Sequence, residues 1–142
     1  MTDYTDTIIR VRYSETDQMG VAHHANYFIW FDVGRTEFCR HFGFQYERME
    51  AEDDTFIVVA EASCRYKRPA QFDDVLKIRT RATGSQRRTV RFGYETLSQA
   101  DQLIATGETL HVFCNRLGHA KSLPQKYHNF FPADSPLTLN RK

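Results

Sequence analysis

One acidic side chain stands just ahead of the segment where a long helix is expected to begin. Asp17 lies in a polar loop that turns at Gly20, and the pair His23-His24 follows. The first turn of a helix carries unpaired backbone N–H groups and a partial positive charge. A carboxylate beside such an anion-binding end is suited to chemistry on a carbonyl group. By spacing alone, Asp17 fits an ordinary turn or helix-capping acid at least as well.

Other kinds of catalytic site are not favoured. His23 and His24 are adjacent, so they cannot share a helix face as paired metal ligands usually do, and we expect no metal site. There is also no glycine-rich phosphate loop. The three cysteines, Cys39, Cys64 and Cys114, are far apart and lack an identifiable base. We therefore expect buried thiols in a reducing compartment rather than nucleophiles or disulfides.

The composition is that of an ordinary globular domain. The 142 residues are 41% hydrophobic, which excludes a chain too polar to fold. The net charge of +1 gives no bulk electrostatic case for binding nucleic acid or an acidic membrane. The first residues show no apolar signal-type run, and no stretch approaches the roughly 20 apolar residues of a membrane span. We expect one cytoplasmic domain over residues 1–142.

The element that would position Asp17 is a helix over about residues 24–42. Apolar residues recur on one face of this segment at helical spacing: Phe28, Phe31, Phe38, Cys39 and Phe42. Gly43 follows the last of them, where a helix-terminating glycine belongs. Asp32 and Arg35 lie on the same side, three residues apart, so we expect an ion pair at the margin of the core.

Five strands are expected around this helix, at residues 5–13, 55–66, 75–83, 89–97 and 102–115. Short turns join the last three, which predicts an antiparallel meander. We expect a solvated connection at 45–54, with a short helix or turn as the alternative, then one helical turn after Pro124 and a loose end over 132–142. The order β-α-β-β-β-β predicts a two-layer α+β domain. Its open sheet edges predict dimerisation.

The stretch from Asp17 to Tyr27, DQMGVAHHANY, followed by Phe31 and Arg35, resembles the signature of the hotdog-fold acyl-CoA thioesterases. The likeness is to the 4-hydroxybenzoyl-CoA thioesterase group, and most of all to its bacterial branch associated with the Tol–Pal system. It continues through YKRPA and FDDVL at 66–76 and covers about residues 5–117, leaving a tail at 118–142. It implies the hotdog fold, a five-stranded antiparallel sheet wrapped around a long central helix. It also implies subunits joined edge to edge as a homodimer or homotetramer.

The resemblance implies roles for four residues. Asp17 matches the nucleophile or general base, a choice that the family leaves open between members. The backbone N–H of His24 matches the donor that polarises the thioester carbonyl. The ring of His24 has a lesser implied role, in holding water or the acid. Asn26 and Tyr27 match the pattern as well, and we expect them to orient the helix start at the substrate side.

A second basic segment is a candidate for holding coenzyme A. Arg87 and Arg88 lie on a turn where the aromatic-thioesterase relatives place a basic run against the CoA phosphates. Two arginines on a hairpin fit a solvated turn equally well. Lys67 and Arg68, on an earlier turn, are a less specific match.

The expected function is hydrolysis of short-chain, medium-chain or aromatic acyl-CoA to the free acid and CoA. No cofactor is expected, since coenzyme A would be present only as part of the substrate. One alternative is an enoyl-thioester dehydratase or hydratase, using Asp17 and His24 as an acid–histidine pair. Another is a non-enzymatic scaffold for acyl carrier protein or envelope-associated partners. The Asp-x-x-Gly spacing and the intact acid favour hydrolysis.

Overall fold

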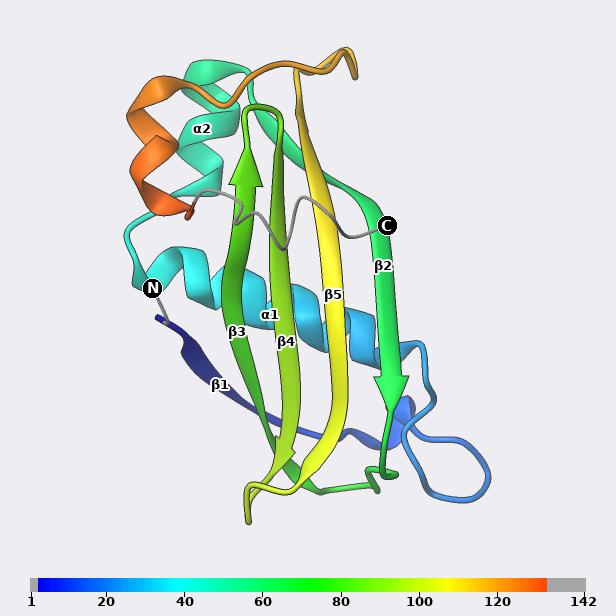
Figure 1. Cartoon of the computed structure of the whole chain (residues 1–142). Coiled ribbons are helices and arrows are strands. Elements are labelled where there is room, and N and C mark those ends of the chain that lie inside the picture. Colours follow the sequence, from blue (N-terminus) through cyan, green and yellow to red (C-terminus); the bar gives the residue numbers. More distant parts are fainter. Residues whose placement is uncertain (1–2, 133–142) are drawn as a thin grey trace.

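The computed structural model of the chain describes residues 3–132. One antiparallel sheet has the strand order β1-β3-β4-β5-β2, and a long helix lies across one of its faces (Figure 1). The strands are β1 (Thr5–Arg10), β2 (Phe56–Tyr66), β3 (Val75–Gln86), β4 (Thr89–Ser98) and β5 (Leu103–Cys114). The helices are α1 (Asn26–His41), α2 (Tyr46–Asp53) and the short 3-10 helices η1 (Tyr13–Glu15) and η2 (Gln125–Phe130). The predicted α+β architecture is confirmed.

The strand pairing gives the sheet two distinct ends. Strands β3, β4 and β5 form the predicted meander, while β1 pairs with β3 and β2 pairs with β5. We call the end formed by the loops at 11–25, 67–74 and 99–102 the loop end. The opposite end, formed by the β3–β4 hairpin, α2 and η2, is the hairpin end (Figure 1). Helix α1 crosses the sheet obliquely, beginning beside the loop end near β2 and ending on the β1–β3 side, from where the chain continues to α2 (Figure 1).

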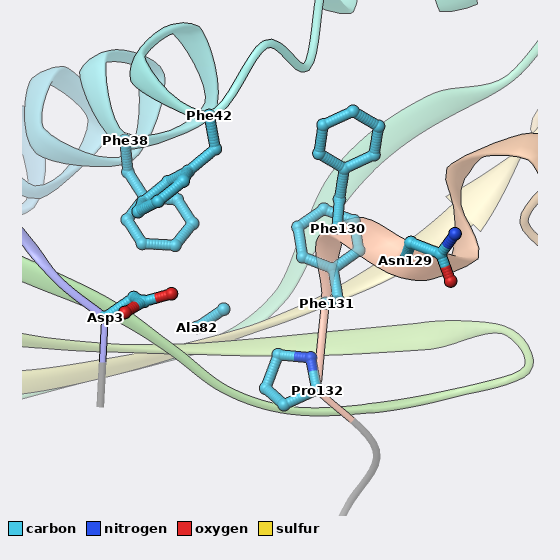
Figure 2. A pocket seen from close by; sticks show the side chains of 8 residues that line it. All are labelled: Asp3, Phe38, Phe42, Ala82, Asn129, Phe130, Phe131 and Pro132. Atoms are coloured by element: carbon cyan, nitrogen blue, oxygen red, sulfur yellow. The ribbon is translucent and has the colours of Figure 1, made fainter. Parts of the chain in front are cut away.

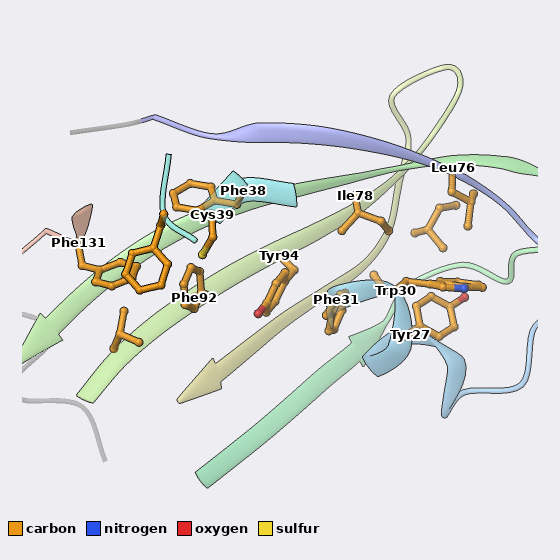
Figure 3. Packing of buried hydrophobic residues seen from close by; sticks show 14 of the residues in the cluster. Tyr27, Trp30, Phe31, Phe38, Cys39, Leu76, Ile78, Phe92, Tyr94 and Phe131 are labelled. Atoms are coloured by element: carbon orange, nitrogen blue, oxygen red, sulfur yellow. The ribbon is translucent and has the colours of Figure 1, made fainter. Parts of the chain in front are cut away.

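Alternation along the strands builds the core between α1 and the sheet (Figure 3). In β3, Leu76, Ile78 and Thr80 are buried at every second position, and β4 shows the same period. From the helix, Phe31 and Phe38 enter this layer, as predicted. The close approach of α1 to β3 depends on a glycine. A Cβ atom on Gly34 would lie 2.5 Å from the Thr80 hydroxyl oxygen.

A buried polar contact marks the middle of the helix. Arg35 pairs with Asp32 at 2.9 Å, and the guanidinium is largely buried while the carboxylate is exposed. This is the predicted ion pair at the core margin. The Arg35 guanidinium also donates to the Tyr94 hydroxyl at 3.4 Å, which ties the helix to β4.

For residues 45–54 the structure favours the alternative of a short helix over the solvated connection that we expected. This segment is helix α2 rather than a solvated connection, and Met49 is completely buried. The acidic residues on either side obscured the single buried position of this helix. Phe44, just before α2, packs against Tyr127, Phe130 and other rings of the tail. The helical turn predicted after Pro124 is confirmed as η2, and residues 133–142 lie outside the described part of the chain.

Candidate active site

The Asp17 loop is held against the neighbouring 67–74 loop by backbone hydrogen bonds. Ala22 N–H donates to the carbonyl oxygen of Ala70 at 2.7 Å, and Phe72 N–H donates to that of Gly20 at 3.0 Å. Gly20 has a φ of +79°, which glycine adopts without a steric penalty. The loop therefore has a defined shape although most of it is exposed.

Asp17 lies at the surface with half of its carboxylate free. Its Oδ1 accepts the backbone N–H of Met19 at 2.9 Å and, more weakly, that of Val21 at 3.4 Å. Within residues 3–132, Oδ2 has no hydrogen-bond or ion-pair partner. The turn thus fixes the direction of the carboxylate and leaves one oxygen available to a water or substrate.

The backbone N–H of His24 is likewise unpaired within the described residues. The oxygen of the same peptide group, on His23, accepts the backbone N–H of Asn26 at 3.0 Å and the Asn26 side-chain amide at 3.2 Å. Because a trans peptide points its oxygen and its N–H in opposite directions, these two bonds aim the His24 N–H away from the helix. Helix α1 begins at Asn26, two residues later than predicted.

Asp17 and His24 meet in one pocket of about 380 Å³ at the loop end. Its lining combines titratable, aromatic and cationic side chains: Asp17, Val21, Ala22, His23, His24, Tyr27, Tyr66, Lys67, Arg68 and Pro69. Of the predicted site residues, Tyr27 is thus brought to Asp17 and His24. Asn26 instead lies behind the pocket wall, where it bonds the loop backbone.

Arg87 and Arg88 are not near this pocket in the same chain. They form the β3–β4 turn at the hairpin end, because β3 runs the length of the sheet away from the loop end. Arg87 donates to the Ser122 hydroxyl at 3.1 Å, and the Arg88 carbonyl accepts the Phe113 N–H at 3.0 Å. The cations that line the pocket are Lys67 and Arg68, whose side chains have no partner within residues 3–132.

Tyr66 is a site residue that the sequence reasoning left without a role. Its hydroxyl donates to the carbonyl oxygen of His24 at 3.0 Å and so anchors the histidine to the end of β2. Burial and the neighbouring Cys64 raise the pKa of Tyr66 to about 12, so the hydroxyl keeps its proton at neutral pH. Tyr66 is the first residue of the matched stretch at 66–70, and this position could have indicated that it belongs to the site.

A second cavity, of about 370 Å³, lies at the hairpin end (Figure 2). Phe38, Phe42, Phe130 and Phe131 supply most of its apolar lining. None of the predicted site residues reaches it, and it contains no pair of groups suited to acid–base chemistry. The candidate site is therefore the pocket at the loop end.

Residues 3–132 contain no cluster of three or more histidine, cysteine or acidic side chains that could hold a metal ion. No helix among them is long and apolar enough to cross a membrane. A carboxylate with a free oxygen and an unpaired N–H donor in one pocket are suited to hydrolysis of an ester or thioester.

Several known proteins are similar to this chain in sequence and in fold. The acyl-CoA thioester hydrolase YbgC of Escherichia coli O6:H1 is 34% identical over 104 residues, 73% of this chain and 77% of that protein. The acyl-CoA thioesterase YbgC of Haemophilus influenzae is 31% identical over 113 residues, 80% and 82% of the two chains. The crystal structure of the DHNA-CoA thioesterase from Staphylococcus aureus matches with a TM-score of 0.82 and 29% identity, covering 89% of this chain and 84% of that one. The fold and its relatives define a hotdog-fold thioester hydrolase.

The match extends over nearly the whole described chain. The model of the thioesterase-like superfamily matches residues 11–131, which include both the Asp17 loop and the η2 tail. The chain belongs to this superfamily.

Proposed function

We propose that the protein hydrolyses acyl-CoA thioesters to the free acid and CoA at the loop-end pocket. The observation that carries the proposal is that Asp17 and the His24 amide share this pocket, each with an unpaired polar atom directed outward. The two YbgC proteins, which are named for this activity, support it.

The chemistry follows from what each group offers. The His24 N–H would stabilise negative charge on the thioester oxygen, and one such donor is typically worth about 10²–10³ in rate. Asp17 would take a proton from water or attack the carbonyl carbon itself. A C–O bond forms, the C–S bond breaks, and the CoA thiolate leaves and takes up a proton. Where Asp17 itself attacks, this step leaves an acyl anhydride on Asp17, which water then hydrolyses to the free acid and the regenerated carboxylate. These groups need no metal or redox cofactor.

The nucleotide part of CoA would be held by cations near the pocket. Lys67 and Arg68 line it and have no partners among the described residues, so their charges are available to phosphate groups. Asn26 and Tyr27 would position the acyl end, Asn26 by ordering the backbone and Tyr27 by direct contact.

A second subunit would change which arginines are available. Strand β2 is a sheet edge with Val58 and Val59 exposed, at 42% and 52%, and an unpaired edge of this kind suits pairing with a second copy. Joining two β2 edges antiparallel about a twofold axis would bring one hairpin end toward the other loop end. Arg87 and Arg88 of the partner subunit could then approach the CoA phosphates. We therefore propose that the protein forms a homodimer or a homotetramer. We also propose that it acts in the cytoplasm.

The test is the Asp17→Asn variant in a thiol-release assay with short, medium, long and aromatic acyl-CoAs. We expect turnover to fall by about 10²–10⁴, with the unfolding transition and oligomeric state unchanged. The matched control is Asp101→Asn, another loop acid, which pairs with Lys77 outside the pocket. If Asp17→Asn turns over acyl-CoA at the parent rate, the assignment of Asp17 is wrong.

The same assays distinguish the alternatives. Asp17 and His24 both line the pocket, so the two residue types of an acid–histidine mechanism lie in one site. Formation of an enoyl product from a 3-hydroxyacyl-CoA without release of thiol would assign a dehydratase or hydratase. Tight binding of acyl carrier protein with no turnover of any acyl-CoA would assign a scaffold.

A further inference from the structure

Glu15 is a buried carboxylate for which the proposed chemistry has no use. It ends η1, two residues before Asp17, and only 4% of it is exposed. A charge is costly to bury unless it is well paired, and most of the loop around it is open to solvent. Its burial therefore calls for a specific explanation.

The Glu15 side chain joins the Asp17 loop to helix α1. Its Oε2 accepts the indole N–H of Trp30 at 3.0 Å and the Arg12 guanidinium at 3.0 Å, while Oε1 accepts the backbone N–H of Arg12 at 2.7 Å. Burial alone would raise the pKa of Glu15, but the bonds from Arg12 and Trp30 outweigh it and lower the pKa below its usual value. The carboxylate is thus held in its ionised form.

The backbone of Glu15 reaches the other half of the site. Its carbonyl oxygen accepts the His23 N–H at 2.8 Å and the Asn26 side-chain amide at 2.8 Å. Asn26 in turn bonds the His23 oxygen, the group that aims the His24 N–H. One residue is therefore connected through its side chain to α1 and through its backbone to the proposed oxyanion donor.

We propose that Glu15 is the positioning residue of the site, fixing the distance between the Asp17 carboxylate and the His24 amide. The proposal rests on the proposed roles of Asp17 and His24. A carboxylate and an amide on one loop can act on the same carbonyl only if that loop keeps its shape during the reaction. A displacement of about 1 Å can cost about 100-fold in rate.

The test compares Glu15→Gln and Trp30→Phe with the parent enzyme. Glu15→Gln removes the charge, and Trp30→Phe removes the N–H donor to Glu15 together with part of the buried indole. We expect kcat to fall by roughly 10- to 100-fold in each, with KM within about twofold, because ground-state binding does not depend on the alignment. The double variant should lose little more than the worse single variant, since both changes weaken the same contact between residues 15 and 30. Glu37→Gln, on the same helix and paired within residues 3–132 with Arg40 alone, is the control and should leave kcat unchanged.

Trp30 provides a direct signature, because it is the only tryptophan in the sequence. Its emission should shift in folded Glu15→Gln, which would show that the indole–carboxylate bond exists in solution. Should Glu15→Gln fail to fold, Trp30→Phe alone tests the alignment, since phenylalanine preserves most of the ring packing.

The outcomes separate this proposal from the proposed function. If Asp17→Asn is inactive but folded Glu15→Gln and Trp30→Phe keep the parent kcat, Glu15 has no positioning role and the proposed function stands. A fall in kcat that only follows a smaller folded fraction, measured by urea unfolding, would also reduce Glu15 to a structural residue. If Asp17→Asn keeps its activity, both proposals are wrong.

Discussion

The two ends of the molecule differ in how far their side chains are buried. At the hairpin end, Phe44 and Met49 are almost completely buried, and the rings of η2 pack against Phe44. At the loop end, Asp17 is exposed, and Met19 and Phe72 beside it are 86% and 51% exposed. Helix α1 connects the two. Residues that bind and react commonly lie on loops held by a rigid scaffold, and here the hairpin end supplies rigidity while the loop end supplies reactive groups.

The largest effect that tests this division is expected from Phe44→Ala. The Phe44 ring contacts those of Tyr46, Tyr127, Phe130 and Phe131 with centroid separations of 5.1–5.5 Å. Removing such a ring from a core costs about 3–5 kcal/mol of unfolding free energy, to be measured by urea unfolding. The exposed Met19→Ala should change it by less than about 0.5 kcal/mol. A folded Phe44→Ala protein with sharply reduced kcat would show that the two ends are coupled.

As the pH falls, we expect the first loss of unfolding free energy to come from the hairpin half of the sheet. His111 on β5 is completely buried, and burial together with Arg35 lowers its pKa from 6.5 to about 3. The unfolded chain therefore binds a proton in this range that the folded chain does not, and stability falls as the pH drops below 6.5. One proton corresponds to about 1.4 kcal/mol per pH unit, so about 2 kcal/mol should be lost between pH 6.5 and 5.

The control for this loss is a pair of histidine variants. His111→Gln should flatten the dependence of unfolding free energy on pH between 6.5 and 5, whereas the exposed His119→Gln should leave it unchanged. At the loop end, stability is lost only at a lower pH. The pKa of Glu15 is lowered from 4.5, so its contribution is present above 4.5 and is lost only as the pH falls through the lower folded value. Equal slopes in the parent and His111→Gln would show that His111 is protonated in the folded protein.

The next effect concerns which end supplies the phosphate contacts. Replacing both Lys67 and Arg68 by alanine should raise the KM for acyl-CoA about tenfold, the equivalent of about 1.4 kcal/mol, and leave kcat unchanged. The same substrate shortened to acyl-pantetheine, which lacks the nucleotide, should show no such change. The comparison variant replaces both Arg87 and Arg88 by alanine, and its KM for acyl-CoA is measured in the same way. A rise in KM there, absent from a monomeric form, would place the partner's hairpin end at the pocket, and no rise in either variant would contradict both assignments.

How far the sequence could predict this arrangement depends on the range of the interaction concerned. The helix and the meander follow from local period, so Phe31, Phe38 and the alternating residues of β4 were correctly assigned to the core. Met49 was missed because it is the single buried residue of an otherwise polar or partly exposed helix, so no apolar period marks it. The remoteness of Arg87 from Asp17 also has a tertiary cause, since it depends on the direction and length of β3. The links from Glu15 to Trp30 and from Tyr66 to His24 join residues 15 and 42 positions apart, beyond the reach of a motif read by spacing.

The smallest effect is expected from the ring of His24. The ring is exposed, stacks on His23 with a centroid separation of 4.3 Å, and makes no hydrogen bond within residues 3–132. His24→Ala keeps the backbone N–H, so kcat should fall by less than about tenfold, well short of the 10²–10⁴ expected for an acid–base group. Steady-state kinetics of His24→Ala and Asp17→Asn gives the ratio of their two losses in kcat. A loss from His24→Ala as large as that from Asp17→Asn would mean that the imidazole itself transfers a proton, and the site would then work as an acid–histidine pair.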